Sequence, residues 1–248
     1  MEHEEYNRDT NPYPSFGKKY NGEKAIISMT SWAARISTCT KTIFSLLKQC
    51  PGFHIVLVLS EEEFPKMMDE LPDNLKLFVD NELIEVLWVY KNYKSFKKVL
   101  FTMDKYRTVP VISADDDCIY TCNYAQELYD KWLENPNCVI SNDCPKNDKL
   151  IWLRGPNTLF PLNLKFNASE LCDLYLNNKY NFFDEDMLFG LFYKLANINV
   201  IDLNKKSFYV FHNEINPLHL TNTKFNFKNR YEILKNFIST VYKQVLTF

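Results

Sequence analysis

The chain has 248 residues, 46% of them hydrophobic and 24% charged, which is the composition of an ordinary globular protein with a sizeable core. Its formal net charge of -2 argues against a general nucleic-acid binder, which would carry a basic excess. With only 5 glycines a glycine-rich phosphate loop is not expected, and 7 cysteines without a CxxC pair favour reduced thiols in the cytoplasm over a disulfide framework.

The N-terminal segment is polar and acidic, and we expect residues 1–22 to form a mobile arm ahead of the folded domain. It shows no basic segment followed by an apolar one, so a secretory signal is not expected. The sequence also contains no apolar run near the roughly 20 residues that span a bilayer.

From residue 25 onward, short apolar runs alternate with helical patterns. Strands are predicted at Ala25–Met29, His54–Ser60, Ile84–Val89 and Val111–Ala114. Helices are predicted between them at residues 41–49, 61–71 and 95–106. This alternation predicts a single α/β domain with an open, mainly parallel sheet that is flanked by helices on both faces.

The second half of the chain has a weaker pattern. Helices are predicted at residues 123–133, 168–176 and 186–195, and short strands at 138–141, 150–153 and 207–211. Residues 154–163, rich in Pro and Asn, are predicted to form a loop. The last segment, 223–248, has the pattern of a basic amphipathic helix, which would pack on the core or lie on an anionic membrane surface.

Three consecutive carboxylates follow the strand at 111–114: Asp115, Asp116 and Asp117. In open α/β sheets, ligands bind beyond the carboxyl ends of the strands. Adjacent carboxylates repel one another, and a divalent cation would neutralise them while keeping positions open for diphosphate oxygens. The alternative is a solvated turn, or acids that favour the start of the helix at residue 123.

Four segments in the same order resemble the bacterial cell-surface polysaccharide glycosyltransferases of the GT-A fold, which are inverting and family-2-like. The segments are MTSWAARI, EEEFP, KSFKK and ADDDCIY. The resemblance extends over about Ala25–Asn142 and fades beyond it. It implies a Rossmann-like GT-A domain that uses Mn²⁺ or Mg²⁺ and moves a sugar from a nucleotide-sugar, most simply a UDP-sugar. The acceptor would be a hydroxyl of a surface glycan or a lipid-linked glycan.

The resemblance assigns the donor site residue by residue. Asp117 would hold the metal, Asp115 would contact the donor ribose or metal-bound water, and Asp116 lies between them. Residues that would bind the base, ribose or diphosphate come from two further segments: Thr30, Ser31, Arg35, Lys94, Lys97 and Lys98. For the lysines the alternative is a solvated helix face. By the same resemblance, residues 23–142 would form the nucleotide-sugar-binding half and residues 143–222 the acceptor-binding half.

A second acidic cluster, Asp184, Glu185 and Asp186, opens a predicted helix. Acids in a first helical turn are stabilised by the helix dipole, so a structural role is one reading. The resemblance implies that this cluster supplies the general base that takes the proton of the acceptor hydroxyl. We expect Asp186 in that role first and Glu185 second, although spacing alone does not separate adjacent helical residues.

Two histidines near the C-terminus, His212 and His219, are candidates to complete the metal coordination, with His219 ahead because the segment after it could fold over the diphosphate. The alternative is that each is exposed or caps a helix. Two other functions also stay open. One is a sugar-phosphate nucleotidyltransferase that releases pyrophosphate, and the other is a catalytically inactive relative that binds glycans.

Overall fold

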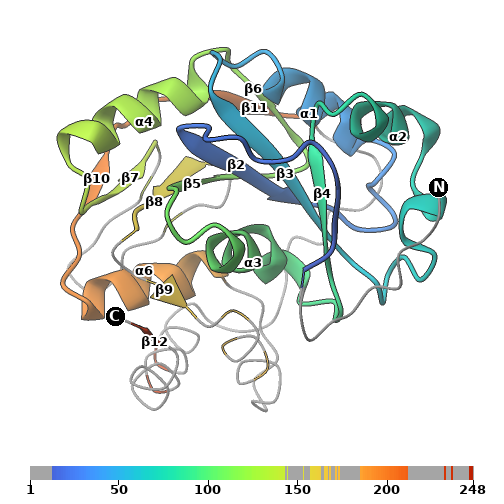
Figure 1. Cartoon of the computed structure of the whole chain (residues 1–248). Helices are drawn as coiled ribbons and strands as arrows, with labels where there is room; N and C mark the ends of the chain where they lie inside the picture. The colour runs from blue at the N-terminus through green and yellow to red at the C-terminus, as the bar shows by residue number, and fades with distance from the viewer. Residues whose placement is uncertain are drawn as a thin grey trace.

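The computed structural model has one mixed α/β sheet at its centre with helices on both faces (Figure 1). It describes residues 13–142, 144, 153, 157–162, 165–166, 168, 171, 173, 185–211, 232, 236 and 246–247. The sheet has 8 strands in the order β1-β4-β3-β2-β5-β8-β7-β10. The strands are β1 (Ser15–Gly17), β2 (Ala25–Thr30), β3 (Phe53–Ser60), β4 (Glu85–Val89), β5 (Val111–Ala114), β7 (Val139–Ser141), β8 (Thr158–Phe160) and β10 (Val200–Asp202).

Parallel pairing dominates the part of the sheet that was expected from the sequence. β2 pairs in parallel with both β3 and β5, and β3 pairs in parallel with β4. Every residue of β3 and β4 is buried, because helices cover both faces and leave no strand face for water. The predicted α/β fold with an open, mainly parallel sheet is confirmed.

The helices divide between two hydrophobic cores. On one face, α3 (Lys97–Lys105) and α6 (Glu185–Leu195) pack on the sheet; on the other lie α1 (Cys39–Leu46), α2 (Asp73–Asp80) and α4 (Tyr124–Glu134) (Figure 1). Two small antiparallel pairs complete the described strands. β6 (Cys118–Tyr120) pairs with β11 (Phe208–Val210), and β9 (Lys165–Phe166) pairs with β12 (Leu246–Thr247).

The helix predicted at residues 61–71 is wrong. That segment contains a 3₁₀ turn at Met67–Glu70, and the α-helix of this connection is α2, which begins after Pro72. Pro65 has no backbone N–H and disfavours a helical conformation in the residue before it, which prevents a continuous helix here. Pro72, by contrast, stands where a helix start tolerates proline.

Two segments expected to lie outside the sheet belong to it. Residues 15–17 of the predicted mobile arm form β1, which pairs antiparallel with β4 along Ser15–Gly17. The predicted loop at 154–163 contains β8, which is fully buried between β5 and β7 and antiparallel to both. The prediction failed because Pro and Asn residues flank this three-residue strand and are typical of loops. Its neighbours in the sheet are also distant in the chain.

Strands β6 and β10 were not predicted, because both are short and follow directly on a turn or a helix. The division into a donor half and an acceptor half stays a prediction, since the sheet continues across residue 142. Of the predicted strand at 150–153 only Leu153 is described, and it lies outside any strand. Of the predicted helix at 168–176 only residues 168, 171 and 173 are described, and they are helical. Most of the segment 223–248 lies outside the described residues; within it residues 232 and 236 are helical, whereas Leu246–Thr247 form strand β12, which departs from the predicted helix because these residues pair with β9.

Candidate functional site

The carboxyl ends of β2, β3 and β5 lie at one edge of the sheet because these strands are parallel. The acidic triplet leaves β5 at this edge, beside the loop that follows β2 and carries Ser31 and Arg35. The β6–β11 pair helps to position the triplet. Phe211 directly follows β11, and its N–H donates a hydrogen bond of 2.9 Å to the Asp117 carbonyl. The Asp115 N–H likewise donates to the Tyr120 hydroxyl oxygen at 2.7 Å.

The central acid, Asp116, faces the protein interior and its side chain is 2% exposed. Ser31 donates a hydrogen bond of 2.6 Å to its Oδ2, and the Arg35 guanidinium lies 2.6 Å from its Oδ1. Burial raises the pKa of Asp116 to about 6, although Arg35 and Ser31 oppose that shift. Asp116 therefore ties the loop after β2 to the turn after β5, and this bond fixes the position of Ser31.

The outer two acids are more accessible, with Asp115 33% and Asp117 23% exposed. Arg35 also pairs with Asp117, at 2.9 Å, and Lys98 pairs with Asp115, at 2.6 Å. Protein cations thus compensate much of the charge of the triplet, so folding does not require a metal for that purpose.

The triplet still suits a hard divalent cation in its chemistry. Each of Asp115 and Asp117 is partly exposed and uses one of its two oxygens for the contact with a basic side chain. Two such carboxylates are sufficient when phosphate oxygens and water complete the coordination. Within the described residues no three His, Cys, Asp or Glu side chains form a metal-holding group, and His212 and His219 lie outside those residues.

Lys98 connects the triplet to the second acidic cluster. Its Nζ lies 2.6 Å from Oδ1 of Asp115 and 3.4 Å from Oε1 of Glu185. The other oxygen of Glu185, Oε2, accepts a hydrogen bond of 2.5 Å from the Ser95 hydroxyl. Burial acts to lower the pKa of Lys98, but the charges of Asp115, Glu185 and Asp186 outweigh it and raise that pKa. The ammonium is therefore charged and shared between the two clusters.

The other two lysines of this segment differ from Lys98. Lys97 is buried, and its Nζ lies 2.7 Å from Glu63 and 3.0 Å from the side-chain oxygen of Asn92. Burial lowers the pKa of Lys97 despite its contact with Glu63. Lys97 thus links the segment before β4, which contains Glu63, to the segment after it, which contains Asn92. Lys94, by contrast, is exposed at the start of the 3₁₀ turn Lys94–Phe96.

Thr30 ends β2, and its hydroxyl donates a hydrogen bond of 2.7 Å to the Val58 carbonyl of β3. Asp186 lies in the first turn of α6 and is half-buried, while Asp184 lies outside the described residues. The structure brings Ser31, Arg35, Lys98, Asp115 and Glu185 together through these contacts, while their roles in binding or catalysis stay predictions. Ser95 and Tyr120 were missed, because a single hydroxyl carries no spacing signal.

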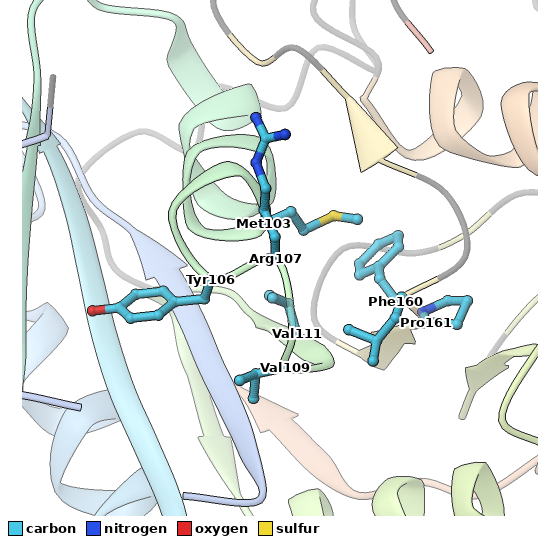
Figure 2. A pocket seen from close by; sticks show the side chains of 8 residues that line it. Met103, Tyr106, Arg107, Val109, Val111, Phe160 and Pro161 are labelled. Atoms are coloured by element: carbon cyan, nitrogen blue, oxygen red, sulfur yellow. The ribbon is translucent and has the colours of Figure 1, made fainter. Parts of the chain in front are cut away.

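A hollow at the opposite edge of the sheet is not part of this site. Figure 2 shows its side chains, which come from the end of α3 and the segment after it, from the start of β5, and from the end of β8 and the two residues after it. Its volume is about 10 Å³, enough for about one water molecule and far too small for a nucleotide. No helix in the described part of the chain has the length and apolar character to cross a membrane.

The sequence matches no protein-family model and no curated protein. Solved structures of similar fold include TarS 1-349 from S. aureus in complex with UDP-GlcNAc, with a TM-score of 0.54 and 13% identity over 89% of this chain and 67% of that one. The glycosyltransferase GlyE from Streptococcus pneumoniae TIGR4 gives a TM-score of 0.49 and 11% identity, covering 90% of this chain and 64% of that one.

The mannosyltransferase PcManGT from Pyrobaculum calidifontis, in complex with GDP-Man and Mn²⁺, gives a TM-score of 0.48 and 14% identity, covering 75% of this chain and 56% of that one. The chain spans 44% of the length of a longer TarS structure, with a TM-score of 0.46. At these identities the likeness shows the fold, which is the GT-A-like fold that the sequence motifs indicated.

Proposed function

We propose that the chain is an inverting glycosyltransferase that moves a sugar from a nucleotide-sugar to a hydroxyl of a glycan acceptor. One observation carries the proposal: the buried Lys98 joins Asp115 of the triplet to Glu185 of the second acidic cluster at the carboxyl edge of the sheet. A donor-binding cluster and a proton-accepting cluster are thereby adjacent. The fold of TarS, which was solved with UDP-GlcNAc, supports a UDP-sugar as the donor.

In this proposal Asp115 and Asp117 hold a divalent cation, Mn²⁺ or Mg²⁺, together with the donor diphosphate. When bound, the cation supplies positive charge that offsets the charge on the departing diphosphate. Ser31 and Arg35, held by Asp116, line the loop that receives the base and ribose. Thr30 positions the end of β2 through its hydrogen bond to Val58. Lys97 positions the segment before α3 through its contact with Glu63.

Asp186 is the proposed general base, which takes the proton of the acceptor hydroxyl as that oxygen attacks the anomeric carbon. Both oxygens of Glu185 are engaged, one by Lys98 and one by Ser95. We assign Glu185 to positioning Lys98 and the start of α6. A glycan or lipid-linked glycan is the proposed acceptor, and contact of residues 223–248 with a membrane stays a prediction.

The proposal is tested by thermal unfolding of the full chain with UDP, GDP or ADP, each with and without Mn²⁺. A nucleotide at about 100 times its Kd should stabilise the protein by roughly 2.7 kcal/mol. We expect stabilisation that needs Mn²⁺ and that Asp117→Ala removes. The matched control is Asp80→Ala, which changes an exposed acid at the end of α2 and should leave the stabilisation intact.

A turnover assay completes the test, with release of nucleoside diphosphate as the measured product. Release of pyrophosphate from a nucleoside triphosphate would instead indicate a nucleotidyltransferase. If no nucleoside diphosphate raises the unfolding temperature, the donor site is assigned wrongly.

A further inference from the structure

The outer surface of α1 and β11 carries three aromatic rings, each with a lysine ammonium beside it. The ammonium nitrogens lie 4.5 Å, 5.3 Å and 5.6 Å from the ring centroids. Figure 1 shows α1 beside the β6–β11 pair. We call this surface the α1–β11 face, and its residues are Lys41, Phe44, Lys48, Lys206, Tyr209 and Phe211.

The residues from α1 and the turn after it form one exposed stripe. Lys41 and Phe44 are three positions apart and Lys48 follows four positions later, which is the spacing that places side chains on one side of a helix. All three are exposed, whereas the residues between them at 42, 43, 45 and 46 are buried. Phe44 is 57% exposed, although phenylalanine is among the residues most often buried.

The strand continues the same surface. Tyr209 and Phe211 are two positions apart and lie on one side of the strand, while Phe208 on the other side packs against Tyr120. Tyr209 is 61% exposed. The ammonium of Lys41 lies 5.6 Å from the Phe211 ring and so connects the strand to the helix stripe. The two elements therefore form one continuous surface.

The lysines of this face add positive charge to it. Within the described residues no carboxylate forms an ion pair with Lys41, Lys48 or Lys206. A nearby acid, Glu127, is itself paired, because it lies 3.3 Å from the ammonium of Lys205. The face is therefore locally basic, although the whole chain has a formal net charge of -2.

Exposed apolar side chains elsewhere on the helices lack this combination. Leu77 of α2 and Leu133 of α4 are exposed as well. The lysines of the same two helices, Lys76 and Lys131, lie within ion-pair distance of a carboxylate of their own helix. Single exposed apolar residues are common on protein surfaces, so the lysines beside the rings are what distinguish the α1–β11 face.

We propose that the α1–β11 face docks the protein on an anionic phospholipid bilayer. Phe44 and Tyr209 place their rings at the boundary of headgroups and acyl chains, where aromatic side chains are favoured. The lysines contact lipid phosphates while their aliphatic stems lie along apolar surface. A bilayer fits this face better than a nucleic acid or an acidic protein does, because it offers anionic phosphates and an apolar layer in one continuous surface.

The α1–β11 face adjoins the carboxylate triplet without including it. The Phe211 N–H donates to the carbonyl of Asp117, whose carboxylate pairs with Arg35. A docked protein therefore holds the carboxyl edge of the sheet close to the lipid headgroups. The face exists whether or not the triplet binds a nucleotide-sugar, so this inference does not depend on the transfer reaction.

Co-sedimentation of the full chain with lipid vesicles tests the proposal. Vesicles of phosphatidylcholine alone are compared with vesicles that also contain phosphatidylglycerol. We expect the anionic vesicles to bind at least about tenfold more tightly, since each lysine near an anionic surface contributes about fivefold. Raising the salt concentration should weaken this binding, because salt screens the contact between lysines and phosphates.

Substitutions on the face should weaken binding to the anionic vesicles. We expect about a fivefold loss for Lys41→Gln and for Lys48→Gln. Phe44→Ala and Tyr209→Ala should each cost about tenfold, because a ring leaves the apolar layer. Lys48→Arg keeps the charge and should bind as wild type does. All of these variants change exposed side chains, so the fold is expected to remain intact.

The matched controls are Lys194→Gln and Leu195→Ala. Both residues are exposed and lie at the end of α6, which packs on the opposite face of the sheet from α1. These variants remove the same kinds of side chain from another surface, and they should bind anionic vesicles as wild type does.

Equal binding to neutral and anionic vesicles, or binding to neither, would overturn the proposal. Unchanged affinity in all four variants with lost side chains would do so too, since the membrane contact would then lie elsewhere, for example in residues 223–248. Binding of single-stranded RNA as tightly as anionic vesicles would show a general polyanion surface and would also refute it. Asp117→Ala should bind vesicles normally, so failure here and failure of the donor site are distinguishable.

Discussion

The Nζ atom of Lys98 lies 2.6 Å from Oδ1 of Asp115, and the same ammonium reaches Glu185 at 3.4 Å. A side chain that is 5% exposed thus carries a charge between two acidic clusters. Without Lys98, Asp115 and Glu185 would lose their shared counter-charge within a largely buried region. This relationship makes the triplet and the second acidic cluster one electrostatic unit.

Lys98→Met should destabilise the protein by about 2 to 3 kcal/mol, because removing one partner leaves charged groups uncompensated. We place the cost below the roughly 3 to 5 kcal/mol of fully buried pairs, since Asp115 is partly exposed. Urea unfolding at pH 7 measures the change. Lys48→Met, which changes an exposed lysine of the α1 region, is the control and should cost below about 0.5 kcal/mol. Equal stability of Lys98→Met and wild type would contradict this electrostatic role.

Asp186→Asn should lower kcat by ~10²–10⁴-fold, the usual contribution of a general base, with little effect on nucleotide binding. Glu185→Gln should lower kcat by only about tenfold, because it alters the position of Lys98 and not proton transfer. Steady-state kinetics of both variants, with nucleotide binding followed by thermal shift, separate the roles. A larger loss in Glu185→Gln than in Asp186→Asn would exchange the two assignments.

Asp116 gives a distinct pH dependence of stability. Its pKa is raised from the ordinary 3.8 to about 6 in the folded protein, so between these pH values the folded state binds more protons than the unfolded state. The contribution of Asp116 to stability is therefore most favourable below pH 3.8 and falls as the pH rises to about 6. At about 1.4 kcal/mol per pH unit, the fall is up to roughly 3 kcal/mol.

The measurement is the difference in free energy of unfolding between wild type and Asp116→Asn from pH 4 to pH 7. Asn keeps an acceptor for Ser31 but does not titrate, so the difference isolates the carboxyl group. We expect wild type to lose stability relative to the variant as the pH rises, with a plateau above about pH 6 to 7. A difference that is constant with pH would show that the Asp116 pKa is not raised.

Gly17 should tolerate substitution poorly. Its φ is +87°, and a Cβ there would lie too close to the Ile84 carbonyl oxygen and to Val79. Gly17→Ala should cost more than about 1 kcal/mol, combining backbone strain with displacement of β1 from β4. Gly22→Ala is the matched control, because Gly22 has a φ of +78° and open space around it. Thermal unfolding should show the larger loss for Gly17→Ala, and equal losses would show that β1 is not held tightly against the sheet.

Much of the architecture follows from local sequence. The apolar runs at 25–29, 54–60 and 84–89 predicted three central strands. When helices cover both faces of a sheet, the side chains on both sides of a strand are buried, so the strand is a nearly continuous apolar run in the sequence. The triplet could also be placed at a strand end from the sequence. A strand that is buried on both faces cannot include three consecutive carboxylates, so the strand has to end before them. The local sequence did not predict β8, because this strand has three residues and its neighbours in the sheet, β5 and β7, are distant in the chain.

The sequence by itself determined that acids stand at the end of β5 and at the start of α6, and that basic residues stand at 94, 97 and 98. Only the tertiary structure decided what each does: Asp116 turns inward to Ser31 and Arg35, Lys97 pairs with Glu63, and Lys98 spans 87 positions to Glu185. The physical reason is that burial and charge partners set the role of an ionisable group. Those partners come from segments that meet only when the sheet has formed.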